Sequence, residues 1–217
     1  MSSPKRNIRI PLLPLLTALA AALVLVAVVV VFLGSRTPGD NSAEAGFSRD
    51  MAIHHAQAVE MAGILRDKAN DDRMKTFAED MTLTQQGQIG QMQGWLAAWG
   101  LPMTSTEPQM EWMGHEVDGQ MPGMANPKEL NTLRNASPVE AEKQFLELMI
   151  PHHKAALDMS DAILARTNRP EVQNLAQAIK DSQKAEIANM NEMLAARGGE
   201  APKTKDKEDH LNHSHEH

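Results

Sequence analysis

The sequence predicts an all-α protein: a four-helix bundle made of two duplicated helical hairpins, preceded by an N-terminal transmembrane helix. Four segments carry apolar residues at alternating spacings of three and four, the period of a helix with one buried face. The second pair of segments repeats the first, because the pattern Met-x-x-His-His occurs at residues 51–55 and again at residues 149–153. Two antiparallel hairpins bury four such stripes most simply as a bundle.

An uncharged apolar segment at residues 10–34 follows three basic residues, Lys5, Arg6 and Arg9. A transmembrane helix needs about 20 apolar residues, whereas the apolar core of a cleaved signal peptide has about 7–15. A single-pass anchor in the cytoplasmic membrane is therefore favoured over secretion after signal cleavage. The positive-inside rule places residues 1–9 in the cytoplasm and the C-terminal domain outside it.

The first hairpin follows a short polar linker over residues 35–45, and the whole bundle is predicted to span residues 46–198. Its first helix is expected from about 46 to 68, with an apolar stripe that runs from Phe47 to Leu65. Asn70 is the expected N-cap of the second helix, which runs to about Trp99.

The second hairpin has clearer boundary signals. A capping box at residues 137–140, with proline at the first helical position, predicts where its first helix begins. Pro151 lies within that helix and should kink it or leave one carbonyl unpaired. Pro170 begins the last helix and two glycines at 198–199 end it. Residues 199–217 are charged and rich in histidine, and we expect a disordered tail.

Composition narrows the function classes. The chain has no cysteine, so disulfides, thiolate zinc sites and thiol nucleophiles are excluded. A net charge of −7 without a basic patch argues against nucleic-acid binding. Methionine is frequent, with 15 residues, so any soft-metal chemistry must use methionine sulfur and histidine nitrogen. The expected partners are a metal ion and the membrane, and no organic cofactor is indicated.

The repeated motif is the main functional clue. A helix returns residues three and four apart to one face, so each methionine and its two histidines form one patch. Thioether and imidazole ligands suit copper, and Cu(I) in particular, better than magnesium, calcium or manganese. The pattern predicts two symmetry-related pockets of sulfur and imidazole; the alternative is a purely structural histidine layer. The predicted metal ligands are Met51, His54, His55, Met149, His152 and His153.

Hairpin geometry brings further polar residues to the level of the histidines. If the first hairpin turns near Asn70, its histidine pair faces two glutamines, and the second pair faces one glutamine and one glutamate. Buried polar groups at one level need either a closed hydrogen-bond network or a metal. These side chains are interpreted as partners that orient the imidazoles, with direct ligation by Glu186 left open. The residues that bind the metal or orient its ligands are predicted to be Gln85, Gln88, Met92, Gln183, Glu186 and Met190.

The connection between the hairpins, residues 101–136, contains five methionines and starts at what we expect to be the end of the bundle that holds Met51 and Met149. It is either a lid, with short helices over 108–117 and after residue 127, or a thioether arm that captures Cu(I), and both can hold. The histidine-rich tail could bind metal weakly. Auxiliary capture of metal is assigned to Met103, Met110, Met113, His115, Met121, Met124, His210, His213, His215 and His217.

Three spaced motifs resemble the domain-of-unknown-function family 305: Phe145-x-x-x-Met149-Ile-Pro-His152-His153-Lys-Ala-Ala-x-Asp-Met159, Gln183-x-x-Glu186-Ile187-x-x-Met190 and Met121-Pro-Gly-Met124. The resemblance covers residues 46–198. It implies a ferritin-like helical bundle, secreted or membrane-anchored in bacteria, in a family with some members linked to copper binding and copper resistance. The first half departs from the pattern, because Ala52-Ile53 precede its histidines and Gln88 stands where the second half has Glu186. If the acidic residue is needed, only the second site is complete.

Together these features predict an extracytoplasmic, membrane-anchored, non-enzymatic protein that sequesters or delivers copper. The first alternative is an anchored helical scaffold whose histidine layer is structural. The second is a ferritin-like metal-dependent oxidoreductase. Such di-iron sites use paired Glu-x-x-His motifs, and the chain contains none.

Overall fold

A computed structural model describes residues 12–34, 37–114, 117 and 119–200, and all regular structure within them is helical. Contacts divide the chain into two units, Met1–Thr37 and Pro38–His217. The described residues of the first unit form helix α1 (Leu12–Gly34). Within the described part of the chain, no helix combines the length and the apolar character that crossing a bilayer requires. The transmembrane prediction is therefore not confirmed. The predicted cytoplasmic segment, 1–9, and nearly all of the tail lie outside the described residues.

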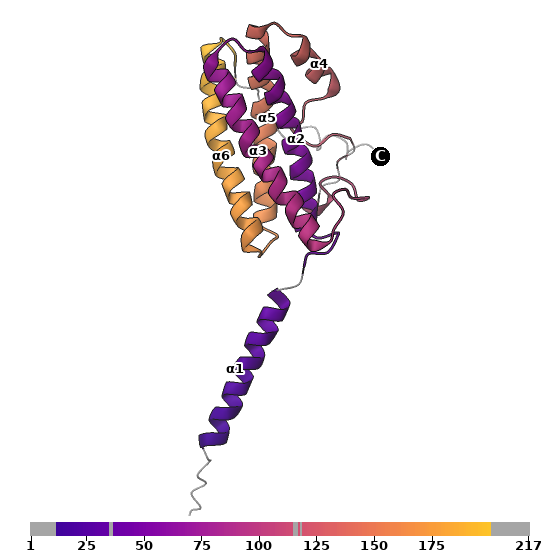
Figure 1. The fold of residues 1–217 in the computed structure, drawn as a ribbon, viewed down its shortest axis with the longest axis vertical. Coiled ribbons are helices and arrows are strands. Elements are labelled where there is room, and N and C mark those ends of the chain that lie inside the picture. The colour runs from indigo at the N-terminus through magenta and orange to yellow at the C-terminus, as the bar shows by residue number, and fades with distance from the viewer. Residues whose placement is uncertain (1–11, 35–36, 115–116, 118, 201–217) are drawn as a thin grey trace, which may run out of the picture. The chain divides into compact units, whose positions relative to one another are not determined.

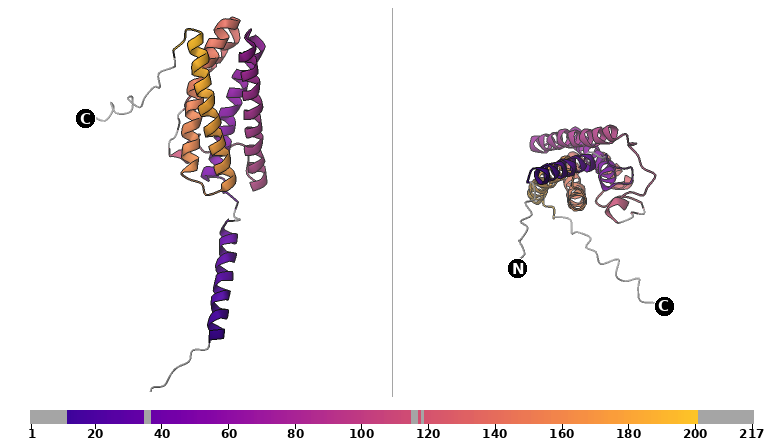
Figure 2. Two further views of the ribbon diagram at one scale, coloured as in Figure 1. Left: turned by 90° about the vertical axis from the view of Figure 1, so that its left-hand side faces the viewer. Right: turned by 90° about the horizontal axis from the view of Figure 1, so that it is seen from below.

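The second unit is a four-helix bundle (Figures 1 and 2). Helix α2 packs against α3 and α5 packs against α6, so each hairpin is a unit, and contact between α2 and α5 joins the two hairpins. The connection adds a single 3₁₀ turn, η1, and one short helix, α4. The bounds are α2 Ala43–Lys68, α3 Asp72–Trp99, η1 Glu111–Met113, α4 Pro127–Asn135, α5 Pro138–Leu164 and α6 Pro170–Ala196.

Local capping sets the helix boundaries of the first hairpin. Helix α2 begins three residues before the expected position, because the Ser42 side chain accepts a hydrogen bond from Ala45 N (3.2 Å). The N-cap of α3 is Asp71, whose carboxylate accepts from Arg73 N (2.8 Å), so the prediction of Asn70 was wrong by one residue. A carboxylate is favoured there because it also interacts with the positive end of the helix dipole.

The second hairpin follows its sequence signals closely. The Glu140 carboxylate accepts a hydrogen bond from Ser137 N (3.3 Å), as a capping box predicts, and a second one from the Ser137 hydroxyl (2.9 Å). Helix α5 continues through Pro151 without a break, and α6 begins at Pro170. The connection contains α4, as expected after residue 127. Where a helix was expected over 108–117, the residues that the structure describes form the short turn η1.

The apolar core consists of two clusters. One contains Phe145 and Met149 of α5 with Leu65 of α2. The other contains Phe47 and Met51 of α2. Residues at matching positions of the repeat thus lie in different clusters. The reason is that α2 and α5 pack against each other in opposite directions. The expectation that Met51 and Met149 lie at the same end of the bundle was therefore wrong.

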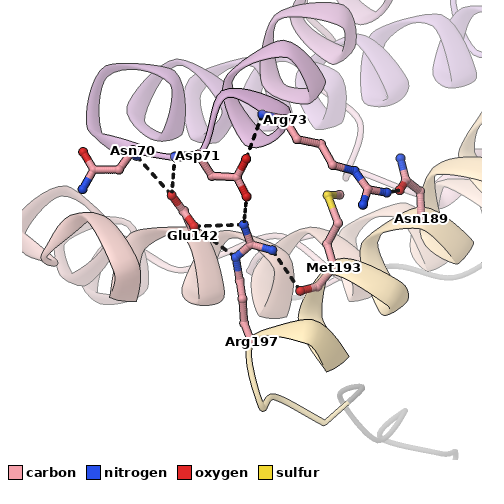
Figure 3. Close-up of polar contacts among 7 residues, drawn as sticks. All are labelled: Asn70, Asp71, Arg73, Glu142, Asn189, Met193 and Arg197. Carbon is pink, nitrogen blue, oxygen red and sulfur yellow. Dashed lines mark hydrogen bonds and ion pairs between the residues drawn. The ribbon is translucent and has the colours of Figure 1, made fainter.

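Ionic contacts fasten the hairpins together at the end of the bundle that holds the α2–α3 turn (Figure 3). The Glu142 carboxylate, at the start of α5, accepts hydrogen bonds from Asn70 N and Asp71 N (3.1 Å each). Arg197, just after α6, donates to Glu142 (3.0 Å) and to Asp71 (2.6 Å). The start of α5, the turn of the first hairpin and the end of α6 are therefore held at one point.

Candidate metal centre

The four motif histidines lie in the interior where α2 and α5 cross. His54, His55, His152 and His153 are all fully buried. The rings of His54 and His152 face each other with centroids 3.7 Å apart and planes inclined by 30°. The His152 and His153 centroids are 6.2 Å apart. The patches predicted as two separate pockets therefore meet across the bundle, and we call these four side chains the histidine layer.

In each hairpin, the second histidine of the motif makes an equivalent hydrogen bond to the other helix of that hairpin. His55 Nε2 lies 2.7 Å from Gln88 Oε1 of α3, and His153 Nε2 lies 2.6 Å from Glu186 Oε2 of α6. These are among the partners that the hairpin geometry predicts. Amide and carboxylate oxygens only accept, so Nε2 donates in both rings, and Nδ1 is the ring nitrogen left without a partner.

His54 has the same tautomer for a different reason. Its Nε2 lies 3.3 Å from the carbonyl oxygen of Pro122, in the connection. A carbonyl can only accept, so this nitrogen donates and Nδ1 is again the free atom.

Many polar atoms of this region are buried without a hydrogen-bond partner. They include Nδ1 of all four layer histidines and Nε2 of His152. Gln85 of α3 and Gln183 of α6 are 2% and 1% exposed, and both atoms of each amide are also without a partner. Buried polar groups are nearly always bonded, and an unsatisfied one costs about 1–3 kcal/mol. Of the two alternatives, a closed hydrogen-bond network or a metal, the network is not closed among these side chains. The unpaired atoms fit a ligand set for a metal.

Burial also lowers the pKa of three of the imidazoles. Desolvation lowers the pKa of His54 to about 4 and that of His55 to about 3, where the neighbouring His54 lowers it further. The pKa of His152 is lowered well below its ordinary value, chiefly by desolvation and then by the neighbouring histidines. These rings are neutral at neutral pH, which is the form that binds metals.

Buried thioethers lie in the clusters on both sides of the histidine layer. Met51 shares its cluster with Met92, and Met149 shares the other with Met190. Among the described residues, no three His, Asp or Glu side chains are grouped so that they could hold one ion. Any site in the layer would therefore need thioether or amide ligands beside imidazole.

The described part of the connection packs on the bundle, as the lid interpretation predicts. The Asp50 carboxylate of α2 accepts hydrogen bonds from Met110 N (2.8 Å) and Trp112 Nε1 (2.9 Å). Burial raises the pKa of Asp50, while these two hydrogen bonds oppose the rise. Met110 and Met121 are buried, Met113 and Met124 are half-buried, and Met103 is exposed. His115, His210, His213, His215 and His217 lie outside the described residues.

A strap formed by residues 120–125 crosses the bundle beside the histidine layer. Gly123 has φ +75°, and a Cβ there would lie 2.6 Å from Pro151 O and 2.9 Å from His152 Cα. Gln57 of α2 fastens the strap, because its amide donates to Ala125 O (2.8 Å) and accepts from Ala125 N (2.7 Å). Sequence reasoning missed Gln57; the Pro-Gly pair was the available signal for a turn at this place.

The fold and the layer define a helical bundle with buried imidazoles and thioethers in its core. The family model described as Domain of unknown function (DUF305) matches residues 44–194. The chain belongs to this family.

Solved structures show the same fold. A DUF305 protein from Streptomyces coelicolor is 39% identical, with a TM-score of 0.73 over 76% of this chain and 99% of that chain. A DUF305 fragment from Deinococcus radiodurans is 33% identical, with a TM-score of 0.61 over 71% and 96%. CopM in its Cu(I)-bound form is 26% identical, with a TM-score of 0.55 over 73% and 99%. CopM has also been solved with Cu(II) and with silver.

A shorter similarity links the chain to an uncharacterized protein of Acanthamoeba polyphaga mimivirus. The two are 46% identical over 56 residues. The matched segment spans 26% of this chain and 37% of the viral protein.

Proposed function

We propose that this protein binds copper without catalysing a reaction, and that it sequesters the ion or delivers it to a partner. One observation carries the proposal: the four histidines of the layer are fully buried, and their Nδ1 atoms have no hydrogen-bond partner. A bound ion would satisfy those lone pairs, whereas an empty layer leaves them at a cost. The similarity to CopM, which has been solved in Cu(I)- and Cu(II)-bound forms, supports the same cargo.

The donor set favours copper over harder ions. With no cysteine in the chain, soft ligation falls to methionine sulfur. Thioether and imidazole suit Cu(I), whereas magnesium, calcium and manganese prefer oxygen ligands. Met51 and Met149 are the thioethers nearest in sequence to the layer, and both are completely buried. We assign ligation to these two methionines and the four layer histidines, with Gln88 and Glu186 orienting two of the rings.

We further propose that the bundle works outside the cytoplasm and is anchored by residues 10–34. The support is the sequence alone: a long apolar segment follows Lys5, Arg6 and Arg9. Fractionation of cells that express the full chain, followed by protease treatment of intact spheroplasts, tests this. The proposal requires a membrane-bound protein whose bundle is degraded from outside. Recovery of a shortened protein in the medium would support signal cleavage and overturn the anchor.

Copper binding is tested by titrating Cu(I) into the purified full-length protein in competition with a chromophoric chelator. The four tail histidines are replaced by Asn in every sample, so that only the bundle is measured. We expect tight Cu(I) binding that is lost when His54, His55, His152 and His153 are all replaced by Ala, with Zn(II) and Fe(II) as metal controls.

A second variant protects the test against misfolding. Replacing Met51 and Met149 by Leu conserves volume in the core, so the fold should persist by circular dichroism while Cu(I) affinity falls. Wild-type protein that binds Cu(I) no more tightly than the four-histidine variant would overturn the proposal and make the layer structural. Oxygen-dependent oxidation of added Fe(II) would instead show an oxidoreductase.

A further inference from the structure

The two halves of the histidine layer are not equivalent, because their outer partners differ by one charge. Gln88 and Glu186 occupy matching positions of the repeat, and each contacts Nε2 of a histidine that lies 33 residues earlier. The distances are 2.7 and 2.6 Å, so the geometry is the same on both sides. The difference is chemical: His55 contacts a neutral amide, whereas His153 contacts a carboxylate.

The partner at Nε2 also affects Nδ1, the ring nitrogen that remains free to bind a metal. Both rings donate Nε2–H outward, and the opposite atom, Nδ1, is buried without a partner. A carboxylate that accepts from the far nitrogen of a ligating histidine makes the ring a stronger donor and adds negative charge beside the ion. A neutral amide orients the ring without adding charge.

Charge beside a site discriminates between oxidation states of one metal. At a given distance, the attraction between a carboxylate and a divalent ion is twice that with a monovalent ion. His153 is fully buried and the Glu186 side chain is only 21% exposed, so solvent screens this pair weakly. The His55 side has no carboxylate in the corresponding place.

We propose that the two halves of the layer prefer copper in different oxidation states: the His55–Gln88 half favours Cu(I), and the His153–Glu186 half favours Cu(II). Gln88 and Glu186 are then the residues that determine specificity, acting through the histidines they position. This inference rests on the proposed copper-binding function and names the form of the ion that each half takes.

The test exchanges the two partners in the full-length protein with the tail histidines replaced. Cu(I) affinity is measured by competition with a chromophoric chelator, and Cu(II) affinity by competition with a second chelator together with electron paramagnetic resonance. For Glu186→Gln we expect Cu(II) affinity to fall by about 10-fold or more while Cu(I) affinity is unchanged. For Gln88→Glu we expect a second Cu(II) ion to bind, with a spectrum like that of the first.

Gln86→Glu is the matched control, because it makes the same charge change on an exposed position of α3. It should leave both affinities unchanged. Equal loss of Cu(I) and Cu(II) in Glu186→Gln, no change in either, or an effect of Gln86→Glu as large as that of Gln88→Glu would overturn the inference. These results leave the proposed function standing, whereas its own failure would appear as a wild-type protein that binds neither ion.

Discussion

The first hairpin, α2–α3, and the second, α5–α6, use matching positions for matching contacts. Glu142 at the start of α5 reaches the turn of the first hairpin. Its repeat partner Glu44, at the start of α2, reaches the turn of the second hairpin, where its carboxylate accepts from the Thr167 hydroxyl (2.8 Å). The start of each hairpin thus contacts the turn of the other, as expected for two copies of one unit packed antiparallel to each other.

The chemistry of the two ends has nevertheless diverged. At the first hairpin's turn, Arg197 joins Glu142 and Asp71 in a cluster of charges. At the opposite end, the positions that match Arg197 and Asp71 hold Trp99 and Arg169, and the Arg169 guanidinium carbon lies 6.0 Å from the Trp99 ring centroid. The repeat fixes which positions meet, and the individual residues then decide the strength of the contact. Matched positions are therefore natural controls for each other.

The largest effect should come from acid. The pKa values of His54, His55 and His152 are lowered in the folded protein. Below about pH 6.5 the unfolded chain therefore binds protons at these three histidines that the folded protein does not bind. Stability is therefore fully present above that pH and is lost as the pH falls towards 4. The expected slope between pH 6.5 and 5 is about 1.4 kcal/mol per pH unit for each of the three histidines. Urea unfolding of the metal-free protein across this range measures it.

The same measurement can separate the hairpins. Two of the lowered pKa values belong to the first hairpin and one to the second, so His54→Gln with His55→Gln should remove about twice the slope that His152→Gln removes. A wild-type stability that is flat between pH 7 and 5 would show that the rings take up protons in the folded state as readily as in the unfolded chain.

The next largest effect should come from the charged end. Glu142→Ala removes the carboxylate that two backbone amides and Arg197 share, while Arg197 keeps its bond to Asp71. We expect a loss of about 3 kcal/mol in the free energy of unfolding, chiefly from the two unsatisfied amides. Glu44→Ala at the matched position removes a single hydrogen bond and should cost about 1 kcal/mol. Urea unfolding at neutral pH measures both. Equal losses would contradict the view that the two ends have diverged.

Most of the helical framework could be predicted from the sequence, because apolar spacing and capping residues act locally. The capping box at Ser137 and the proline that begins α6 are both local signals of this kind. The errors came where a choice between neighbours depends on geometry, as with Asp71 in place of Asn70 at the N-cap of α3. The placement of Met51 and Met149 in different clusters depends on how two hairpins dock, which periodicity does not encode.

The histidine layer was predictable in composition but not in arrangement. Hairpin register alone brought Gln88 to His55 and Glu186 to His153. The close approach of His54 and His152 required the crossing of α2 over α5. The contacts of the strap join residues 68 positions apart, a separation at which sequence spacing carries no information.

A smaller loss is expected for the strap, which crosses only one face of the layer. Gln57→Ala removes the amide that pairs with Ala125, leaving Ala125 N unsatisfied while Ala125 O keeps its contact with Gln120 (2.6 Å). We expect a cost of about 2 kcal/mol, with faster hydrogen exchange at Ala125 and faster modification of His54 by diethylpyrocarbonate. Gln86→Ala, at an exposed position of α3, is the control. An unchanged modification rate would show that the strap does not shield the layer.

The smallest effect should be at the opposite end, where Arg169 lies over Trp99. A double-mutant cycle of Arg169→Gln and Trp99→Leu isolates this contact from the other bonds of Arg169, including the one to Glu171 (3.4 Å). At a partly exposed site we expect a coupling of about 0.5 kcal/mol. The corresponding cycle of Glu142→Ala and Arg197→Gln should give a coupling several times larger, because that pair is more buried and charged on both sides. Equal coupling energies would mean that the two ends differ in appearance but not in strength, and that the repeat has kept its energetics along with its geometry.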